Sequence, residues 1–272
     1  MHRRLITELP SRVINKWQVQ GGDVCILPVG SVEVLGPHLP MGARTFVAEA
    51  FAKLLAEAGD GLYLPPVPLS PVAGAAGLPG TVDVSEPPVN RLLRALLDDM
   101  LKTGFRRILL VTYLDYARYY LPVEFYEDHE VAAAGIHLNE ALWRPTEKRG
   151  IGNDSVMLGA LKLLGRDELL AKCLDAAERW KAEGKSAAPL PEAYQEVIKI
   201  GVAGVRFPKG YYPMPPTGVI DPDAGAEVLR EAAAEKVPAL EDLRAYNEYL
   251  ARRGSRGFLR GGWFRDEEGG AR

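Results

Sequence analysis

An unbroken apolar run that leads straight into a charged loop is the feature that most constrains this chain. Residues 24–29 read Val-Cys-Ile-Leu-Pro-Val, which has the length and the β-branched content of a buried strand. Gly30 ends the run, and Glu33 and His38 follow within the next eight residues. In an α/β protein the loop that leaves the carboxyl end of a strand is where chemistry is usually placed. We therefore expect a functional site directly after this strand.

Strand-like and helix-like patterns alternate along the chain. Strand patterns cover residues 24–29, 62–67 and 108–111, and helical periodicity covers residues 46–58 and 89–103. Short connections between such segments favour parallel strands with helices packed against them. The sequence therefore predicts an α/β fold in which helices cover both faces of a mostly parallel sheet.

Four stretches, in this order, resemble the elements of the creatininase (creatinine amidohydrolase) family: Pro28–Pro40, Leu78–Val82, Gly104–Val111 and Thr217–Ala224. The first of these family elements reads Pro-x-Gly-Ser-x-Glu-x-His-Gly-x-His-Leu-Pro. The resemblance implies the creatininase-like three-layer α/β/α sandwich and a cyclic homo-oligomer, often a hexamer. We take residues 1–251 as a single domain and residues 252–272 as a Gly/Arg-rich C-terminal tail.

The metal ligands of the family are mostly replaced. The family binds two divalent metals such as Zn or Mn, and the resemblance assigns ligand roles to a Glu, a His and a bridging Asp. Glu33 is kept, but Leu35 stands at the His position and Arg44 at the Asp position. Leu114 replaces a later His, and residues 148–155 lack the family's catalytic His and two Glu. We therefore expect no metal site of the family kind and no cofactor.

Polar residues nevertheless remain around the positions that lost their ligands. The candidate catalytic residues are Glu33 and Asp115, and the candidate substrate-binding residues are His38, Arg44, Tyr113 and Tyr116. The guanidinium of Arg44 can pair with Glu33 in place of a metal cation. Arg44 and Tyr113 would then bind an anionic or carbonyl-bearing ligand while Glu33 or Asp115 handles a proton. The alternative is that these side chains only satisfy one another in a vestigial cleft, with His38 supporting the loop.

Two other segments invite a functional interpretation. Residues 124–130 hold four carboxylates and His129, which could form a replacement metal site, but acidic runs on helices are more often solvated faces. Residues 252–272 combine arginines with aromatic residues, as RNA-binding segments do. Because the tail also carries acidic residues, we favour a flexible terminus or an arm that docks on another subunit.

Composition excludes several classes of function. The net charge is −3, which does not favour a nucleic-acid or membrane-surface partner. The two cysteines, Cys25 and Cys173, lie far apart and show no metal-binding spacing, which suits reduced thiols in the cytosol. No signal-peptide pattern follows the first residues. We expect a cytoplasmic protein whose partner is a small-molecule ligand.

Two functions from different classes remain open. In the first, the chain is a hydrolase of the cyclic amidohydrolase type that opens a small cyclic amide or cyclic ketone without the usual metal pair. In the second, it is a non-catalytic binding subunit or a partner of an active paralogue. A polar cleft around Glu33, Arg44 and Asp115 would favour the first; a cleft filled by Leu35, Leu114 and Tyr116 would favour the second.

Overall fold

The computed structural model describes residues 4–72, 75–113, 125–126, 131–184, 192–193, 212, 214–216 and 218–253. Its sheet has the strand order β2-β1-β3-β5-β4. The strands are β1 (Val24–Val29), β2 (Leu62–Tyr63), β3 (Arg107–Thr112), β4 (Phe125–Tyr126) and β5 (Val131–His137). Only β4 runs antiparallel to its neighbour; the other pairings in this sheet are parallel. The predicted mostly parallel sheet is confirmed.

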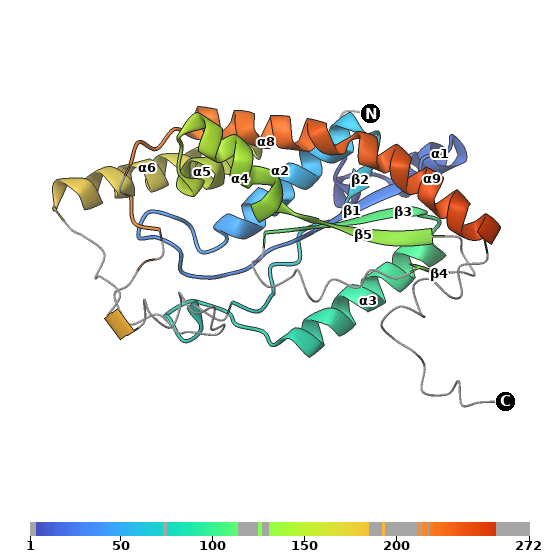
Figure 1. Ribbon diagram of the computed structural model, residues 1–272, viewed down its shortest axis with the longest axis horizontal. Helices are drawn as coiled ribbons and strands as arrows, with labels where there is room; N and C mark the ends of the chain where they lie inside the picture. Colours follow the sequence, from blue (N-terminus) through green and yellow to red (C-terminus); the bar gives the residue numbers. More distant parts are fainter. Residues whose placement is uncertain are drawn as a thin grey trace.

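Helices cover both faces of this sheet and complete the predicted α/β/α sandwich (Figure 1). They are α1 (Ser11–Val19), α2 (Ala43–Ala58), α3 (Glu86–Lys102), α4 (Leu138–Arg149), α5 (Asn153–Leu163), α6 (Asp167–Ala182), α8 (Pro222–Lys236) and α9 (Pro238–Arg253), with a short 3-10 helix at Ile6–Glu8. Figure 1 shows α3 below the sheet and α2, α5 and α8 above it. No helix among the described residues is long and apolar enough to span a bilayer.

Successive side chains of β1 point to opposite faces of the sheet and pack in two separate core clusters. Val24 and Ile26 face the cluster that contains α2, α5 and α8, whereas Cys25, Leu27 and Val29 face the cluster that contains α3. All six residues of β1 are buried, and so are all six of β3. Strands that are apolar on both faces belong in the centre of a parallel sheet, which is where these two lie.

Some predicted boundaries were wrong for identifiable reasons. The strand predicted at residues 62–67, interrupted by Pro65 and Pro66, is continuous only over Leu62–Tyr63, because the two prolines have no N–H to extend the ladder. After them Val67 pairs with Val29 again in an isolated parallel bridge. The acidic segment taken as a helix contains the antiparallel strand β4, and residues 127–130 lie outside the described part. Helices α2 and α3 each begin three residues before their predicted starts.

Two glycines let α5 and α8 cross at backbone contact. A Cβ atom on Gly225 would overlap the backbone carbonyl of Ser155, and one on Gly159 would overlap the backbone of α8. Asp221 begins α8 by accepting hydrogen bonds from the backbone N–H groups of Asp223 (3.0 Å) and Ala224 (2.9 Å). Asp221 of the late family-like element therefore starts α8, and Gly225, directly after that element, lets α8 pack on α5.

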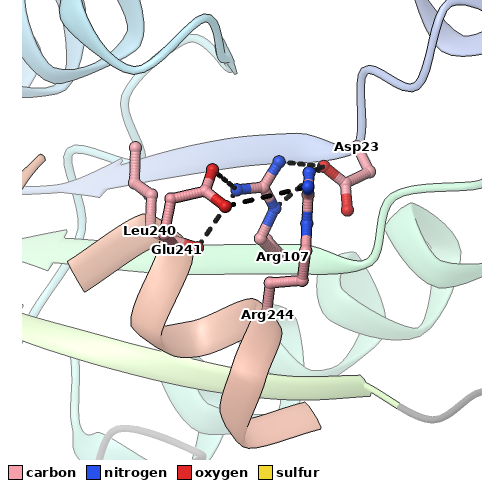
Figure 2. Close-up of polar contacts among 5 residues, drawn as sticks. All are labelled: Asp23, Arg107, Leu240, Glu241 and Arg244. Carbon is pink, nitrogen blue, oxygen red and sulfur yellow. Dashed lines mark hydrogen bonds and ion pairs between the residues drawn. The ribbon is translucent and has the colours of Figure 1, made fainter. Parts of the chain in front are cut away.

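An arginine at the amino end of β3 attaches α9 to the sheet (Figure 2). Arg107 is 5% exposed; its Nε donates to Asp23 Oδ1 at 2.9 Å and its Nη1 donates to the Leu240 carbonyl at 3.1 Å. The same Nη1 lies 3.0 Å from Glu241 Oε1. Burial opposes the charge, but the hydrogen bonds and charges of Asp23 and Glu241 raise the pKa of Arg107 above its ordinary value.

The surroundings of Glu49, a partly buried carboxylate on α2, disfavour its charged form, whereas those of Arg107 favour its charged form. Burial raises the pKa of Glu49 above its usual value, while the charge of Arg166 partly offsets that rise. Burial, together with the charge of Glu49, also raises the pKa of the nearby Tyr63 to about 12. The charged form of Glu49 is therefore disfavoured in the folded protein.

We predict that Gly225→Ala lowers the free energy of unfolding by about 1–3 kcal/mol, because the added methyl group forces α8 away from α5. Urea unfolding of the variant and of Gly218→Ala measures this. A Cβ atom on Gly218 meets no atom within 4 Å, so the control reports only the altered unfolded chain. Equal effects of the two changes would contradict the close crossing.

We predict that Glu49→Gln gains stability relative to wild type as the pH rises. A raised carboxyl pKa means that the folded state binds the proton more tightly, so wild-type stability falls as pH rises from the unfolded pKa, about 4.3, through the folded one. Urea unfolding at pH 4 and pH 7 tests this, with the exposed Glu57→Gln on the same helix as control. A gain that does not depend on pH would refute the assignment.

Candidate functional site

The candidate site lies where β1 and β3 end side by side, with Val29 opposite Thr112. Gly30 follows β1 and accepts no side chain, because a Cβ atom there would overlap the backbone of Thr45 in α2. The Thr45 hydroxyl donates to the backbone carbonyl of Ser31 at 2.8 Å. The strand end and the first turn of α2 are thus held against each other.

The segment between β1 and α2 is closed into a compact loop. The Glu33 N–H donates to the Met41 carbonyl at 2.9 Å, and the Val34 N–H donates to the Thr81 hydroxyl at 3.1 Å. Thr81 belongs to the second family-like element, so the loop contacts a segment that the sequence analysis singled out independently. This closure places Glu33 near Arg44 in the first turn of α2.

Glu33 is at the centre of a buried charged cluster. Its side chain is 6% exposed and accepts a 2.5 Å hydrogen bond from the Ser31 hydroxyl at Oε1. Arg44 Nη1 lies 3.3 Å from the same oxygen, and the guanidinium carbon of Arg44 lies 5.6 Å from the centre of the Tyr113 ring. This is an ion pair supported by a cation–π contact, with both charges removed from most of the solvent. The predicted pairing of Arg44 with Glu33 is present.

A second buried polar pair was not anticipated. His38 Nε2 lies 3.6 Å from Asp154 Oδ2, and the His38 side chain is 0% exposed. Asp154 lies in the first turn of α5, where its Oδ1 accepts from the Ser155 N–H at 2.8 Å. The sequence analysis considered residues 148–155 only for the family ligands that they lack. The sequence signal that could have drawn attention to Asp154 is a short polar side chain at the start of a helix, directly after Gly152.

The residue at the lost histidine position is part of the apolar core. Leu35 is 2% exposed and packs in the same cluster as Tyr113. Its carbonyl accepts from the Met214 N–H at 2.9 Å. Met214, which precedes α8 in the chain, therefore contacts the site at Leu35.

Four of the six predicted site residues are described: Glu33, His38, Arg44 and Tyr113. Tyr113 directly follows β3, Glu33 and His38 lie in the loop that leaves β1, and Arg44 lies in the first turn of α2. Glu33, Arg44 and Tyr113 form one cluster. Asp115, Tyr116 and Leu114 lie outside the described residues, so their predicted roles stay predictions. Within the described part of the chain, no three His, Cys, Asp or Glu side chains are grouped so that they could hold a metal ion.

Comparison with known proteins gives one family. Residues 8–113 match the family model Creatininase, described as creatinine amidohydrolase. No curated protein matches the chain. The matched range includes Glu33, Arg44 and Tyr113, so the comparison covers the charged cluster itself.

Solved structures of similar fold carry the same family name. A mutant creatininase of Zn-Zn type matches with a TM-score of 0.63 and 16% identity, over 88% of this chain and 98% of that chain. A creatinine amidohydrolase (creatininase) matches with a TM-score of 0.58 and 15% identity, over 92% and 98%. A putative creatinine amidohydrolase from Bacteroides fragilis matches with 0.52 and 17%, over 82% and 90%. At these identities the structures establish the fold.

The family model thus matches the segment that builds the site, and the architecture around that segment is that of solved creatininases. Residues 8–113 of this chain are therefore similar to the creatininase family, and the chain has the fold of solved creatininases.

Proposed function

We propose that this protein is a hydrolase-like member of the creatininase family that acts on a small cyclic substrate without the family's pair of metal ions. The observation that carries the proposal is the buried cluster of Glu33, Arg44, Ser31 and Tyr113 at the carboxyl edge of the sheet. The substrate class follows from the solved relatives named creatininase, and the proposed reaction is the opening of a cyclic amide or a cyclic ketone.

The residues present do not fit the metal pair that the family name implies. A two-metal hydrolase needs several anionic or imidazole ligands that converge on the ions. The Leu35 side chain has no atom that binds a metal ion, and it is buried in the apolar core. Arg44 adds a permanent positive charge; two like unit charges about 4 Å apart repel by roughly 4 kcal/mol at an effective dielectric constant of about 20, and a divalent ion is repelled more strongly. We derive no catalytic step that uses a metal.

The buried pair favours a functional role over an inert one. Replacing a buried ion pair by apolar residues is often neutral or stabilising, so a vestigial cleft has no energetic reason to keep Glu33 and Arg44 charged. In the proposed reaction Glu33 accepts a proton from the attacking water, while Arg44 and Tyr113 bind the oxygen on which negative charge develops. Asp115, Tyr116 and His38 are proposed to complete the site.

A second candidate function is a non-catalytic one. It is favoured by Leu35, which fills the lost ligand position with apolar volume, and by the low exposure of Glu33. In that case the chain is a binding subunit or a partner of an active paralogue. Under both proposals the chain forms a homo-oligomer, with a hexamer as the expected form, and works in the cytoplasm; two buried free cysteines suit a reducing compartment.

We predict that the purified protein holds less than one Zn or Mn ion per chain and that a chelator leaves its melting temperature unchanged. The reason is the loss of ligands at Leu35 and Arg44. Elemental analysis and thermal unfolding with and without EDTA measure both quantities. Two tightly held transition-metal ions per chain would refute the metal-free site. Added Zn or Mn is likewise expected to produce no hydrolysis of creatinine.

We predict that at least one small cyclic compound stabilises the wild-type protein and loses its effect in Arg44→Ala. Thermal shift with hydantoin, succinimide and cyclohexane-1,3-dione, followed by product analysis, covers cyclic amides and ketones. Removing a desolvated charged partner costs about 2–4 kcal/mol, which is roughly 30- to 1000-fold in affinity.

Two further variants control this experiment. Arg44→Lys keeps a positive charge beside Glu33, so the fold should be preserved. It removes the planar guanidinium, whose N–H groups can donate two hydrogen bonds to one ligand. Arg230→Ala removes an exposed arginine of α8 and should change nothing. If no compound stabilises wild type, or if Arg44→Ala responds as wild type does, the non-catalytic function takes precedence.

A further inference from the structure

We propose that the Thr112 hydroxyl is a specificity-determining contact of this site, which donates a hydrogen bond to the second carbonyl of a cyclic dicarbonyl substrate. The inference rests on the proposed function, which assigns the reacting carbonyl to Arg44 and Tyr113, and it narrows the substrate class. The observation that carries it is a fully buried hydroxyl that the folded chain leaves unpaired.

Thr112 differs from the other buried threonines in its hydrogen bonding. It is 0% exposed, and its Oγ1 has no hydrogen-bond partner in the part of the chain that the structure describes. The Thr45 hydroxyl donates to the Ser31 carbonyl at 2.8 Å, and the Thr146 hydroxyl donates to the Leu142 carbonyl at 2.6 Å. A buried hydroxyl without a partner destabilises the fold, and a valine of the same shape would avoid that penalty. Packing alone therefore gives no reason for threonine at this position.

Thr112 lies at the edge of the sheet where the charged cluster forms. It is the last residue of β3, stands opposite Val29 of β1 and directly precedes Tyr113. Leu110 packs in the cluster that contains α3, so strand alternation places Thr112 on that face and Tyr113 on the other. Ligands of α/β proteins bind outside the carboxyl ends of the strands, where a ring lying across the edge can contact both faces.

The chemistry of the two contacts favours a ring with two carbonyl groups. Arg44 and Tyr113 are assigned the oxygen on which negative charge develops, and the Thr112 hydroxyl can donate to a further oxygen. The two oxygens of a cyclic imide or dione point away from the ring in different directions, so each can reach one of these contacts. A ring with a single carbonyl leaves the buried hydroxyl unpaired, and the site therefore discriminates against it.

The experiment compares ligands that differ by one carbonyl. Succinimide is paired with 2-pyrrolidinone, and cyclohexane-1,3-dione with cyclohexanone. Affinities are measured by thermal-shift titration of the wild type, Thr112→Val, Thr112→Ser and Thr146→Val. Thr146→Val is the matched control, because Thr146 is also buried but its hydroxyl is already paired within α4.

We expect Thr112→Val to bind the dicarbonyl compounds about 3- to 10-fold more weakly than the wild type, as loss of one hydrogen bond implies. Its affinity for the monocarbonyl compounds should be unchanged. Thr112→Ser keeps the hydroxyl and should retain the wild-type preference for two carbonyls. Thr146→Val should also retain that preference, because its hydroxyl lies outside the site.

Urea unfolding without ligand supplies a second readout. Thr112→Val should raise the urea midpoint, because it removes an unpaired buried hydroxyl, whereas Thr146→Val should lower it by removing a paired one. A midpoint that falls in Thr112→Val as it does in Thr146→Val would mean that the hydroxyl is already paired without ligand, and would overturn the inference.

Failure of this inference is distinguishable from failure of the proposed function. If the dicarbonyl compounds bind the wild type in a manner that depends on Arg44, but bind Thr112→Val equally well, the role of Thr112 falls and the proposed function stands. If no compound stabilises the wild type, the proposed function falls and this inference falls with it.

Discussion

The parallel pairing of β1 with β3 is the contact on which the rest of the molecule depends. Six residue pairs lie in register, from Val24 opposite Arg107 to Val29 opposite Thr112. Both strands are buried along their whole length, so a slip of one residue would exchange the two core faces. The register therefore decides which polar residues meet at each edge. At the carboxyl edge it brings the loop after β1 to Tyr113, and at the amino edge it brings Asp23 to Arg107.

The two edges use arginine in different ways. Arg107 binds Asp23, Glu241 and the Leu240 carbonyl, so its donors are directed at protein groups that hold α9 (Figure 2). It lies at the amino ends of the strands, where α/β proteins rarely bind ligands. Arg44 lies at the opposite edge, beside a carboxylate and over an aromatic ring. Position in the sheet thus separates a structural arginine from a candidate functional one.

The sequence predicted structural features that depend on residues close together in the chain. It missed features that depend on contacts between distant segments. The strands β1 and β3 were predictable because long apolar runs have few other uses, and the pairing of Arg44 with Glu33 was predictable because a cation had replaced a metal ligand beside a retained carboxylate. Asp154 was missed because α5 brings it to His38 from far along the chain. The strand β4 was missed because its aromatic residues were flanked by acids, which suggested a solvated helix.

The replacement of metal by arginine limits the chemistry that the proposed hydrolase can perform. A metal ion lowers the pKa of bound water to about 7, whereas a carboxylate only accepts a proton while water attacks. Arg44 can stabilise an oxygen that gains negative charge, but it cannot create a hydroxide. The proposed site therefore suits substrates whose carbonyl is already reactive and whose leaving group tolerates negative charge. A cyclic ketone meets both conditions when a second carbonyl lies β to the first, because cleavage of the C–C bond then releases an enolate, which takes back the proton that Glu33 accepted from water. An unactivated cyclic amide meets them less well, because its nitrogen must be protonated before it leaves. On this reasoning a cyclic ketone with a second carbonyl in the β position is the better substrate for a site built on Glu33 and Arg44.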